Sequence, residues 1–170
     1  MSPRPEYLSP RDESITDDDL DALWNRQLMV PVEGLTRRSL RDDFRAMRGT
    51  RIHGALDMLA PRYSAVLAVD DCVIGRLATG AVGGIVVYAT DPTDRFVYYY
   101  AHLQRYRRGL AVGDRVAKGS VIGYVGTTGN APPDTPHLHF QVMKRAAGRA
   151  WWDGPSINPL TFFAFDGVRP

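Results

Sequence analysis

The stretch Pro136-His137-Leu138-His139-Phe140 leads into an apolar run at residues 138–143 that has the length and composition of a β-strand. Alternate residues of a strand face the same way, so His137 and His139 are expected on one face, with Cα atoms roughly 7 Å apart. One imidazole can then bind a metal ion while the other lies near a bound water or a substrate. Such a pair also occurs on surfaces and in cores, so the rest of the chain must decide between these readings.

Further strand-like runs lie upstream of this stretch. They are short and rich in Val, Ile, Tyr and Phe, at residues 64–69, 72–78, 84–90, 95–101 and 121–125. Turn-forming pairs such as Gly83-Gly84, Asp91-Pro92 and Gly113-Asp114 separate them. Strands do not alternate with helices, which argues against a doubly wound fold. We therefore predict a mainly β protein, built on a small antiparallel sheet.

The N-terminal part of the chain has a different pattern. Residues 1–13 resemble a flexible arm, and Thr16 followed by three aspartates is a good helix start. An apolar stripe at helical spacing follows, made of Leu20, Leu23, Trp24 and Leu28. Pro31 is expected to close this helix, and its stripe either docks on the main domain or meets a partner. We predict an arm and helix over residues 1–30 and one main domain over residues 31–170.

Composition narrows the classes of function. The chain has 170 residues and a net charge of +2, which is too small to argue for a nucleic-acid partner. Cys72 is the only cysteine, which excludes an intramolecular disulfide and a zinc site made of cysteine pairs. No run approaches the roughly 20 apolar residues of a membrane span, and no signal peptide is visible. Oligomeric state has no signature in this sequence.

All four histidines of the chain fall in three short motifs: His53-Gly-Ala-Leu-Asp57, Tyr100-Ala-His102-Leu and His137-Leu-His139. His53 and Asp57 share a face in either a strand or a helix, and the strand-like surroundings favour an extended setting. Two imidazoles and one carboxylate are a familiar zinc set, with the fourth position open to water. Zinc would lower the pKa of that water and polarise a substrate carbonyl.

The positions of the glutamates indicate which residues handle the proton. The glutamates are Glu6, Glu13 and Glu33, all upstream of the first histidine motif, so a helix-borne His-Glu-x-x-His mechanism is absent. Histidine is then the expected base of an amide hydrolase. The candidates are His102 and whichever of His137 and His139 is not a metal ligand.

Several motifs in order resemble those of the LytM/lysostaphin-type zinc endopeptidases, which cut peptide bonds in bacterial peptidoglycan. The matching segments are Arg51 to Pro61, Tyr100 to Leu103, Val112 to Gly119, Val121 to Gly129 and Pro136 to Phe140. The resemblance implies that His53, Asp57 and His139 bind Zn²⁺ and that His102 and His137 form the catalytic pair. It does not say which of the pair is the base. Ala55 departs from the family, in which many members have glycine at that position.

The resemblance also implies a substrate groove between loops. Residues 126–136 would form one wall, and Trp151 and Trp152 either form another or pack against the sheet. Tyr100 shares strand parity with His102 and is a candidate substrate-binding residue. A peptidoglycan peptide is the implied substrate, and an extracytoplasmic location follows from that substrate, although no export signal is visible.

Two other interpretations remain at this stage. Relatives that have lost their zinc ligands act as non-catalytic cell-wall-binding or hydrolase-activating modules, but the ligand set here is complete. A carrier domain of the lipoyl or biotinyl type would use Lys118 in the hairpin that follows Gly113. Lys118 lacks the neighbouring methionine of such carriers, and the four histidines would then have no role.

Overall fold

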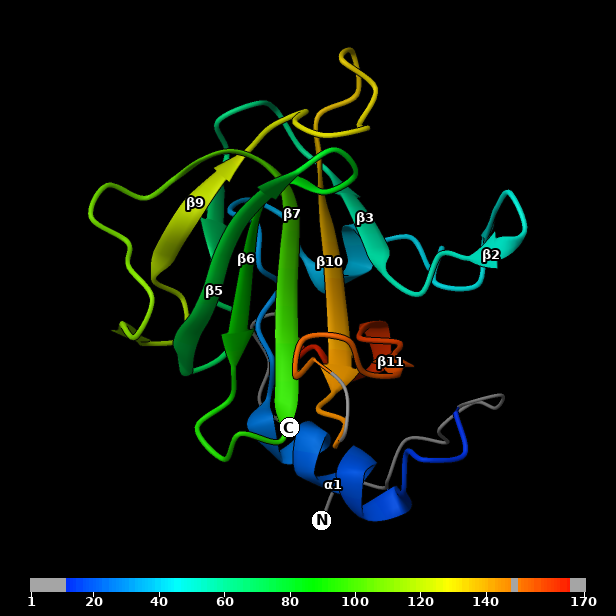
Figure 1. Cartoon of the computed structure of the whole chain (residues 1–170). Helices are drawn as coiled ribbons and strands as arrows, with labels where there is room; N and C mark the ends of the chain where they lie inside the picture. Colours follow the sequence, from blue (N-terminus) through cyan, green and yellow to red (C-terminus); the bar gives the residue numbers. More distant parts are fainter. Residues whose placement is uncertain (1–11, 148–149, 166–170) are drawn as a thin grey trace.

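The computed structural model describes residues 12–147 and 150–165 of the chain. Its helices are α1 (Asp17–Arg26) and two short 3-10 helices, η1 (Arg37–Ser39) and η2 (Leu160–Phe162) (Figure 1). The strands are β1 (Met47–Arg48), β2 (Arg51–Ile52), β3 (Leu56–Leu59), β4 (Ala65–Leu67), β5 (Cys72–Gly80), β6 (Gly84–Thr90), β7 (Phe96–Tyr106), β8 (Arg115–Val116), β9 (Val121–Val125), β10 (His137–Lys144) and β11 (Ser156–Ile157). Every run predicted as a strand is confirmed. Among the described residues, no helix has the length and apolar character needed to cross a membrane.

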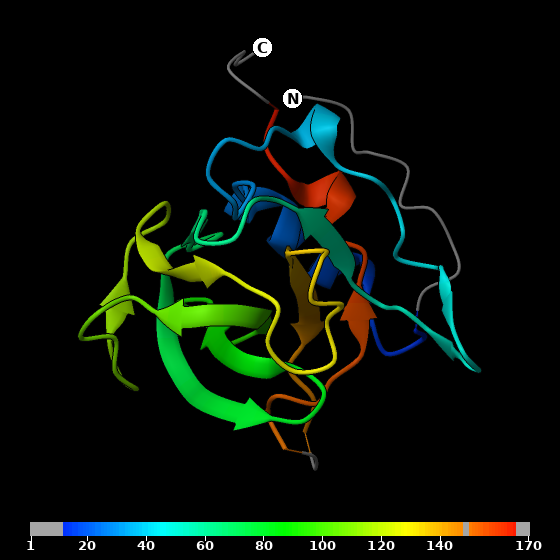
Figure 2. The ribbon, with the colours of Figure 1, turned by 90° about the horizontal axis from the view of Figure 1, so that it is seen from above.

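Nine of these strands form one antiparallel sheet. Its main path runs β11-β10-β7-β6-β5-β8, while β3 pairs with β10 and β9 links β7 to β4. The strands β1 and β2 form a separate hairpin that projects from the side of the sheet (Figure 1). Seen from above, the sheet curls strongly (Figure 2). The prediction of a mainly β fold with one short N-terminal helix is confirmed.

Strand β10 carries the core on one face and the histidines on the other. Leu138, Phe140 and Val142 are fully buried in the apolar core, as the alternation of the sequence requires. His137 and His139 point away from that core. The register sets His139 opposite Asp57 of β3 on one side and opposite Ala101 of β7 on the other. Strand pairing alone therefore brings together residues that lie 82 positions apart in the chain.

Helix α1 begins at the predicted residue but ends earlier than predicted. Thr16 and Asp19 form a capping box, in which each side chain accepts the other residue's backbone N–H. The helix ends at Arg26 because Gln27 adopts a left-handed conformation with φ 51°, so Pro31 does not terminate it. Leu20 and Leu23 are buried in the common core, so the stripe docks on the sheet.

Asp19 also ties the helix to the sheet. Its carboxylate accepts hydrogen bonds from Arg95, just before β7, and pairs with Lys144 of β10 at 2.7 Å. Burial opposes ionisation of Asp19, but the hydrogen bonds from Lys144, the Thr16 backbone and Arg95 outweigh it and lower the pKa of the carboxyl. The helix therefore stays docked through a buried, ionised carboxylate.

Candidate metal centre and its surroundings

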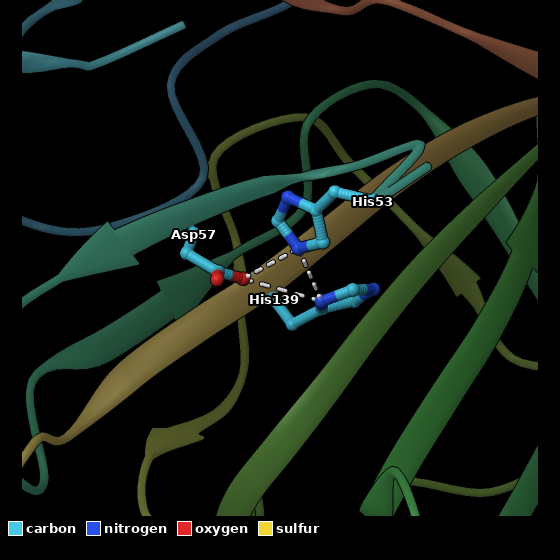
Figure 3. Close-up of side chains that lie close together, drawn as sticks. All are labelled: His53, Asp57 and His139. Carbon is cyan, nitrogen blue, oxygen red and sulfur yellow. Dashed lines mark hydrogen bonds and ion pairs between the residues drawn. The ribbon is translucent and has the colours of Figure 1, made fainter. Parts of the chain in front are cut away.

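Three side chains converge on one point above the sheet. His53 Nε2 lies 3.1 Å from Asp57 Oδ1, His139 Nδ1 lies 3.2 Å from the same oxygen, and the two nitrogens are 3.2 Å apart (Figure 3). His53 comes from the loop before β3, while Asp57 and His139 are cross-strand partners on β3 and β10. These three residues are the group among the described residues whose ligand atoms are placed to hold a metal ion.

The protonation of His53 is set by a backbone carbonyl. His53 Nδ1 lies 3.1 Å from Asp43 O, which can only accept a hydrogen bond. The proton therefore sits on Nδ1, and Nε2 directs a lone pair at the centre of the cluster. The His53 side chain is only 4% exposed, so water cannot solvate that lone pair freely. Converging lone pairs and a carboxylate in a half-buried site are the chemistry that a bound cation satisfies.

Asp57 is ionised and held from both sides. Burial would raise the pKa of its carboxyl, but the hydrogen bond with His139 and the neighbouring imidazoles lower it well below the usual range. Oδ1 faces the two ligand histidines, and Oδ2 accepts a bond from Arg48 Nη2 at 3.1 Å. The backbone N–H of Asp57 donates to Asp43 Oδ1 at 3.3 Å. This leaves one carboxylate oxygen directed at the centre.

His102 and His137 lie beside the cluster, and each ring contacts a backbone carbonyl through the same nitrogen. His102 Nδ1 is 2.8 Å from Thr128 O, and His137 Nδ1 is 3.0 Å from Thr135 O, so both rings carry the Nδ1 proton and present an unprotonated Nε2. Their ring centroids are 4.9 Å apart. Burial lowers the pKa of His102 and so favours the neutral form of the ring. The hydrogen bond with the Thr128 carbonyl acts in the opposite direction but is outweighed. Both are placed to accept a proton from a substrate or a water.

The surroundings of His102 depend on two glycines. Gly84 and Gly129 have φ values of 67° and 72°, and a Cβ on either would come within about 2.3 Å of the facing loop. Only glycine lets the β5–β6 turn approach the segment at Thr128 this closely. The backbone N–H of His102 then donates to Gly83 O at 2.7 Å. The turn and the loop together fix the imidazole of His102.

The cluster lies in an open groove of about 630 Å³. Residues 130–132 and Thr135 line one side, so part of the segment 126–136, predicted as a wall, does border this groove. Arg41, Asp43, Ala46 and Arg48 line another side, and Leu59, Val82 and Tyr99 complete much of the rest. Trp151 and Trp152 do not line this groove. Trp151 packs on Gly75, where an added Cβ would lie 2.5 Å from its ring.

The strand-parity argument for Tyr100 is wrong. Tyr100 is fully buried in the core, where its hydroxyl accepts a hydrogen bond from Val69 N at 3.0 Å. His102 has a positive φ of 59°, and the pairing of β7 with β6 shifts register there, so residue parity changes between Tyr100 and His102. Tyr99 faces the groove instead, with its ring 5.9 Å from that of His139.

Three ligand groups beside two further imidazoles, on the floor of an open groove, are the arrangement expected of a metal-dependent hydrolase. Residues 51–159 match Peptidase family M23, which is more than half of the chain. The chain therefore belongs to Peptidase family M23.

The chain is also similar to individual proteins that carry names. The chain is 33% identical over 120 residues, 68% of its length, to the L-Ala–D-Glu endopeptidase of Bacillus subtilis, and the match spans 36% of that protein. It is 47% identical over 94 residues, 54% of its length, to the glycyl-glycine endopeptidase ALE-1 of Staphylococcus capitis, of which the match spans 24%. The structure of Csd3 from Helicobacter pylori superposes with a TM-score of 0.61 at 32% identity, covering 80% of this chain and 33% of that one. The chain thus spans about a third or less of these proteins.

The carrier interpretation of Lys118 finds no support in the structure. Lys118 Nζ donates to the carbonyl oxygens of Arg26 and Gln27 at 2.8 and 2.9 Å. These are carbonyls at the C-terminal end of α1, where a cation is favoured by the helix dipole. Lys118 therefore has a structural role that needs no covalent modification.

Proposed function

We propose that this protein is a zinc-dependent endopeptidase that hydrolyses peptide bonds in the cross-links or stem peptides of bacterial peptidoglycan. The observation that carries the proposal is the triangle formed by His53 Nε2, Asp57 Oδ1 and His139 Nδ1, with sides of 3.1–3.2 Å. Membership of Peptidase family M23 and the endopeptidase names of two relatives support the reaction type and the substrate. In this proposal residues 31–170 form the peptidase domain and residues 1–30 an N-terminal arm and helix.

The size of the triangle favours zinc. Zinc–nitrogen bonds of about 2.0–2.1 Å in a tetrahedral site place the ligand atoms roughly 3.3–3.4 Å apart. The three sides in this protein lie within about 0.3 Å of that spacing. Calcium, with bonds of about 2.3–2.6 Å and six to eight oxygen ligands, fits neither the spacing nor the imidazoles.

The remaining residues handle the proton and the substrate. Bound zinc lowers the pKa of a coordinated water and polarises the scissile carbonyl. His102 and His137 present Nε2 atoms on the same side, and His137 Nε2 lies 3.7 Å from Asp57 Oδ1. One imidazole would accept the proton of the attacking water and pass that same proton to the leaving amine, while the other, protonated from solvent, would donate a hydrogen bond to the oxyanion and keep its proton. The carbonyls of Thr128 and Thr135 hold both rings in place throughout.

The substrate places the protein outside the cytoplasm. Peptidoglycan lies in the cell envelope, so we propose that the protein acts in the periplasm or at the cell wall. A peptidoglycan peptide is its proposed partner.

Digestion of purified peptidoglycan sacculi tests this proposal. We expect the protein to release fragments whose masses show cut peptide bonds and intact glycan strands, and we expect a chelator to stop the release. Binding to sacculi without any release would instead indicate a non-catalytic cell-wall module. Fragments with intact peptides and cut glycan strands would overturn the proposed reaction.

A further inference from the structure

The segment 41–48 forms part of the groove although it precedes the part of the chain that matches the family, residues 51–159. The backbone N–H groups of His53 and Gly54 donate to Ala46 O and Phe44 O, both at 2.8 Å. These two bonds fix the segment against the loop that carries the first ligand histidine. The backbone of this segment is therefore held at the edge of the site.

Two arginines of this segment, Arg41 and Arg48, line the groove, and they differ in whether a carboxylate pairs with them. Arg48 is paired with Asp57 at 3.1 Å and lies 3.7 Å from Asp43. Arg41 is exposed to solvent, and no carboxylate in the described part of the chain pairs with it. Among the described residues of the groove, the guanidinium of Arg41 is therefore the cation that can pair with a negatively charged ligand.

The other walls offer no competing charge. Segment 41–48, the metal cluster and the catalytic pair account for half of the groove residues. The others are uncharged: Leu59, Val82, Gly83, Tyr99, Ala101, Asn130, Ala131, Pro132 and Thr135. The two carboxylates of the groove, Asp43 and Asp57, already face Arg48 and the ligand histidines. A substrate carboxylate that enters the groove therefore meets an open guanidinium fork, which suits bidentate carboxylate binding.

We propose that Arg41 determines substrate specificity by binding a free carboxylate of the peptide beside the scissile bond. The preferred substrates are then stem peptides that carry such a carboxylate, and uncharged glycine bridges are poor substrates. The proposal rests on the proposed endopeptidase function and names its substrate class. The two relatives described above bear names from both classes, L-Ala–D-Glu and glycyl-glycine, so family membership does not decide between them.

Matched synthetic peptides test this role. All three are amidated at the C-terminus: one is a stem tetrapeptide in which D-Glu keeps its free α-carboxylate, the second carries D-isoglutamine at the same position, and the third is pentaglycine. We expect the wild-type protein to favour the carboxylate peptide over its amide by about three- to tenfold in kcat/KM, through KM, and pentaglycine to be cut least. Added salt should reduce this preference.

Arg41→Gln should remove the preference, raising KM for the carboxylate peptide while kcat and zinc content stay unchanged. Arg108→Gln is the matched control, because Arg108 is exposed and lies outside the groove. If the wild-type protein cuts both tetrapeptides equally, or Arg41→Gln slows both equally, Arg41 does not bind the carboxylate, although the endopeptidase function stands. If the wild-type protein cuts none of the peptides and releases nothing from sacculi, the proposed function itself fails.

Discussion

Replacement of His102 by alanine separates proton transfer from metal binding. The His102 ring is 5.8 Å from that of His139, centroid to centroid, and its Nδ1 bonds to a loop carbonyl instead of to a metal ligand. Truncation therefore leaves the triangle of His53, Asp57 and His139 unchanged. We expect His102→Ala to keep one equivalent of zinc and to lose most of its turnover.

The magnitude follows from what the imidazole contacts. Loss of a positioned acid–base group lowers turnover by about 10²- to 10⁴-fold. The variant also loses the hydrogen bond to Thr128 O, which costs about 1 kcal/mol and leaves a part-buried carbonyl without this partner. Alanine keeps the unfavourable φ of 59° that histidine already tolerates, so no new backbone strain arises. A domain stable by about 5–15 kcal/mol withstands this loss.

The assay measures zinc content, thermal unfolding and peptide hydrolysis on the same preparation. His102→Asn serves as the control, since asparagine tolerates a positive φ and can donate to Thr128 O but is not a base near neutral pH. Its stability should lie closer to that of the wild-type protein while its turnover stays as low as that of the alanine variant. Wild-type turnover in His102→Ala, or loss of its zinc, would refute the role assigned to this residue.

Three further predictions concern a support of the metal site, a buried tyrosine and the docking of helix α1. Asp43→Ala removes the acceptor of the Asp57 backbone N–H and should weaken zinc binding by about 10- to 100-fold, measured by competition with a chromogenic chelator; unchanged affinity would argue against this support. Tyr100→Phe should cost about 1 kcal/mol in urea unfolding through the lost bond to Val69 N and leave KM unchanged, whereas a raised KM would return Tyr100 to the groove. The folded pKa of Asp19 is lowered, so its ionised form stabilises the protein above pH 4 or so, and this stability is lost as pH falls. Asp19→Asn should therefore cost about 2–3 kcal/mol at pH 7, only slightly less at pH 3.5 and clearly less at pH 2, and an equal cost at pH 7 and pH 2 would contradict this linkage.

Much of the sheet could be predicted from the sequence because each strand is short, apolar and bounded by turn residues. The histidine pair of β10 followed from simple alternation, since nothing interrupts that strand between His137 and Val142. Grouping the histidines with Asp57 required the family resemblance, because His139 and Asp57 meet only through the pairing of β10 with β3. Local pattern carries no information about such a long-range register.

The parity of β7 could not be predicted, because one residue in a left-handed conformation reverses it. His102 has no sequence mark that distinguishes it from an ordinary strand residue, so Tyr100 was expected in the groove and Tyr99 was not. The support from segment 41–48 was also missed. Its contacts with His53 and Gly54 use backbone carbonyls, which any sequence can provide.

Titration of the metal-free protein with zinc tests the central claim most directly. The protein is stripped with a chelator, zinc is added back in known amounts, and hydrolysis of a peptidoglycan stem peptide is measured at each point. We predict that activity rises linearly, stops rising at one equivalent, and never appears in His139→Ala. Full activity in the stripped wild-type protein, or the same titration curve in His139→Ala, would contradict the assignment of His53, Asp57 and His139 as the zinc ligands of a peptidase.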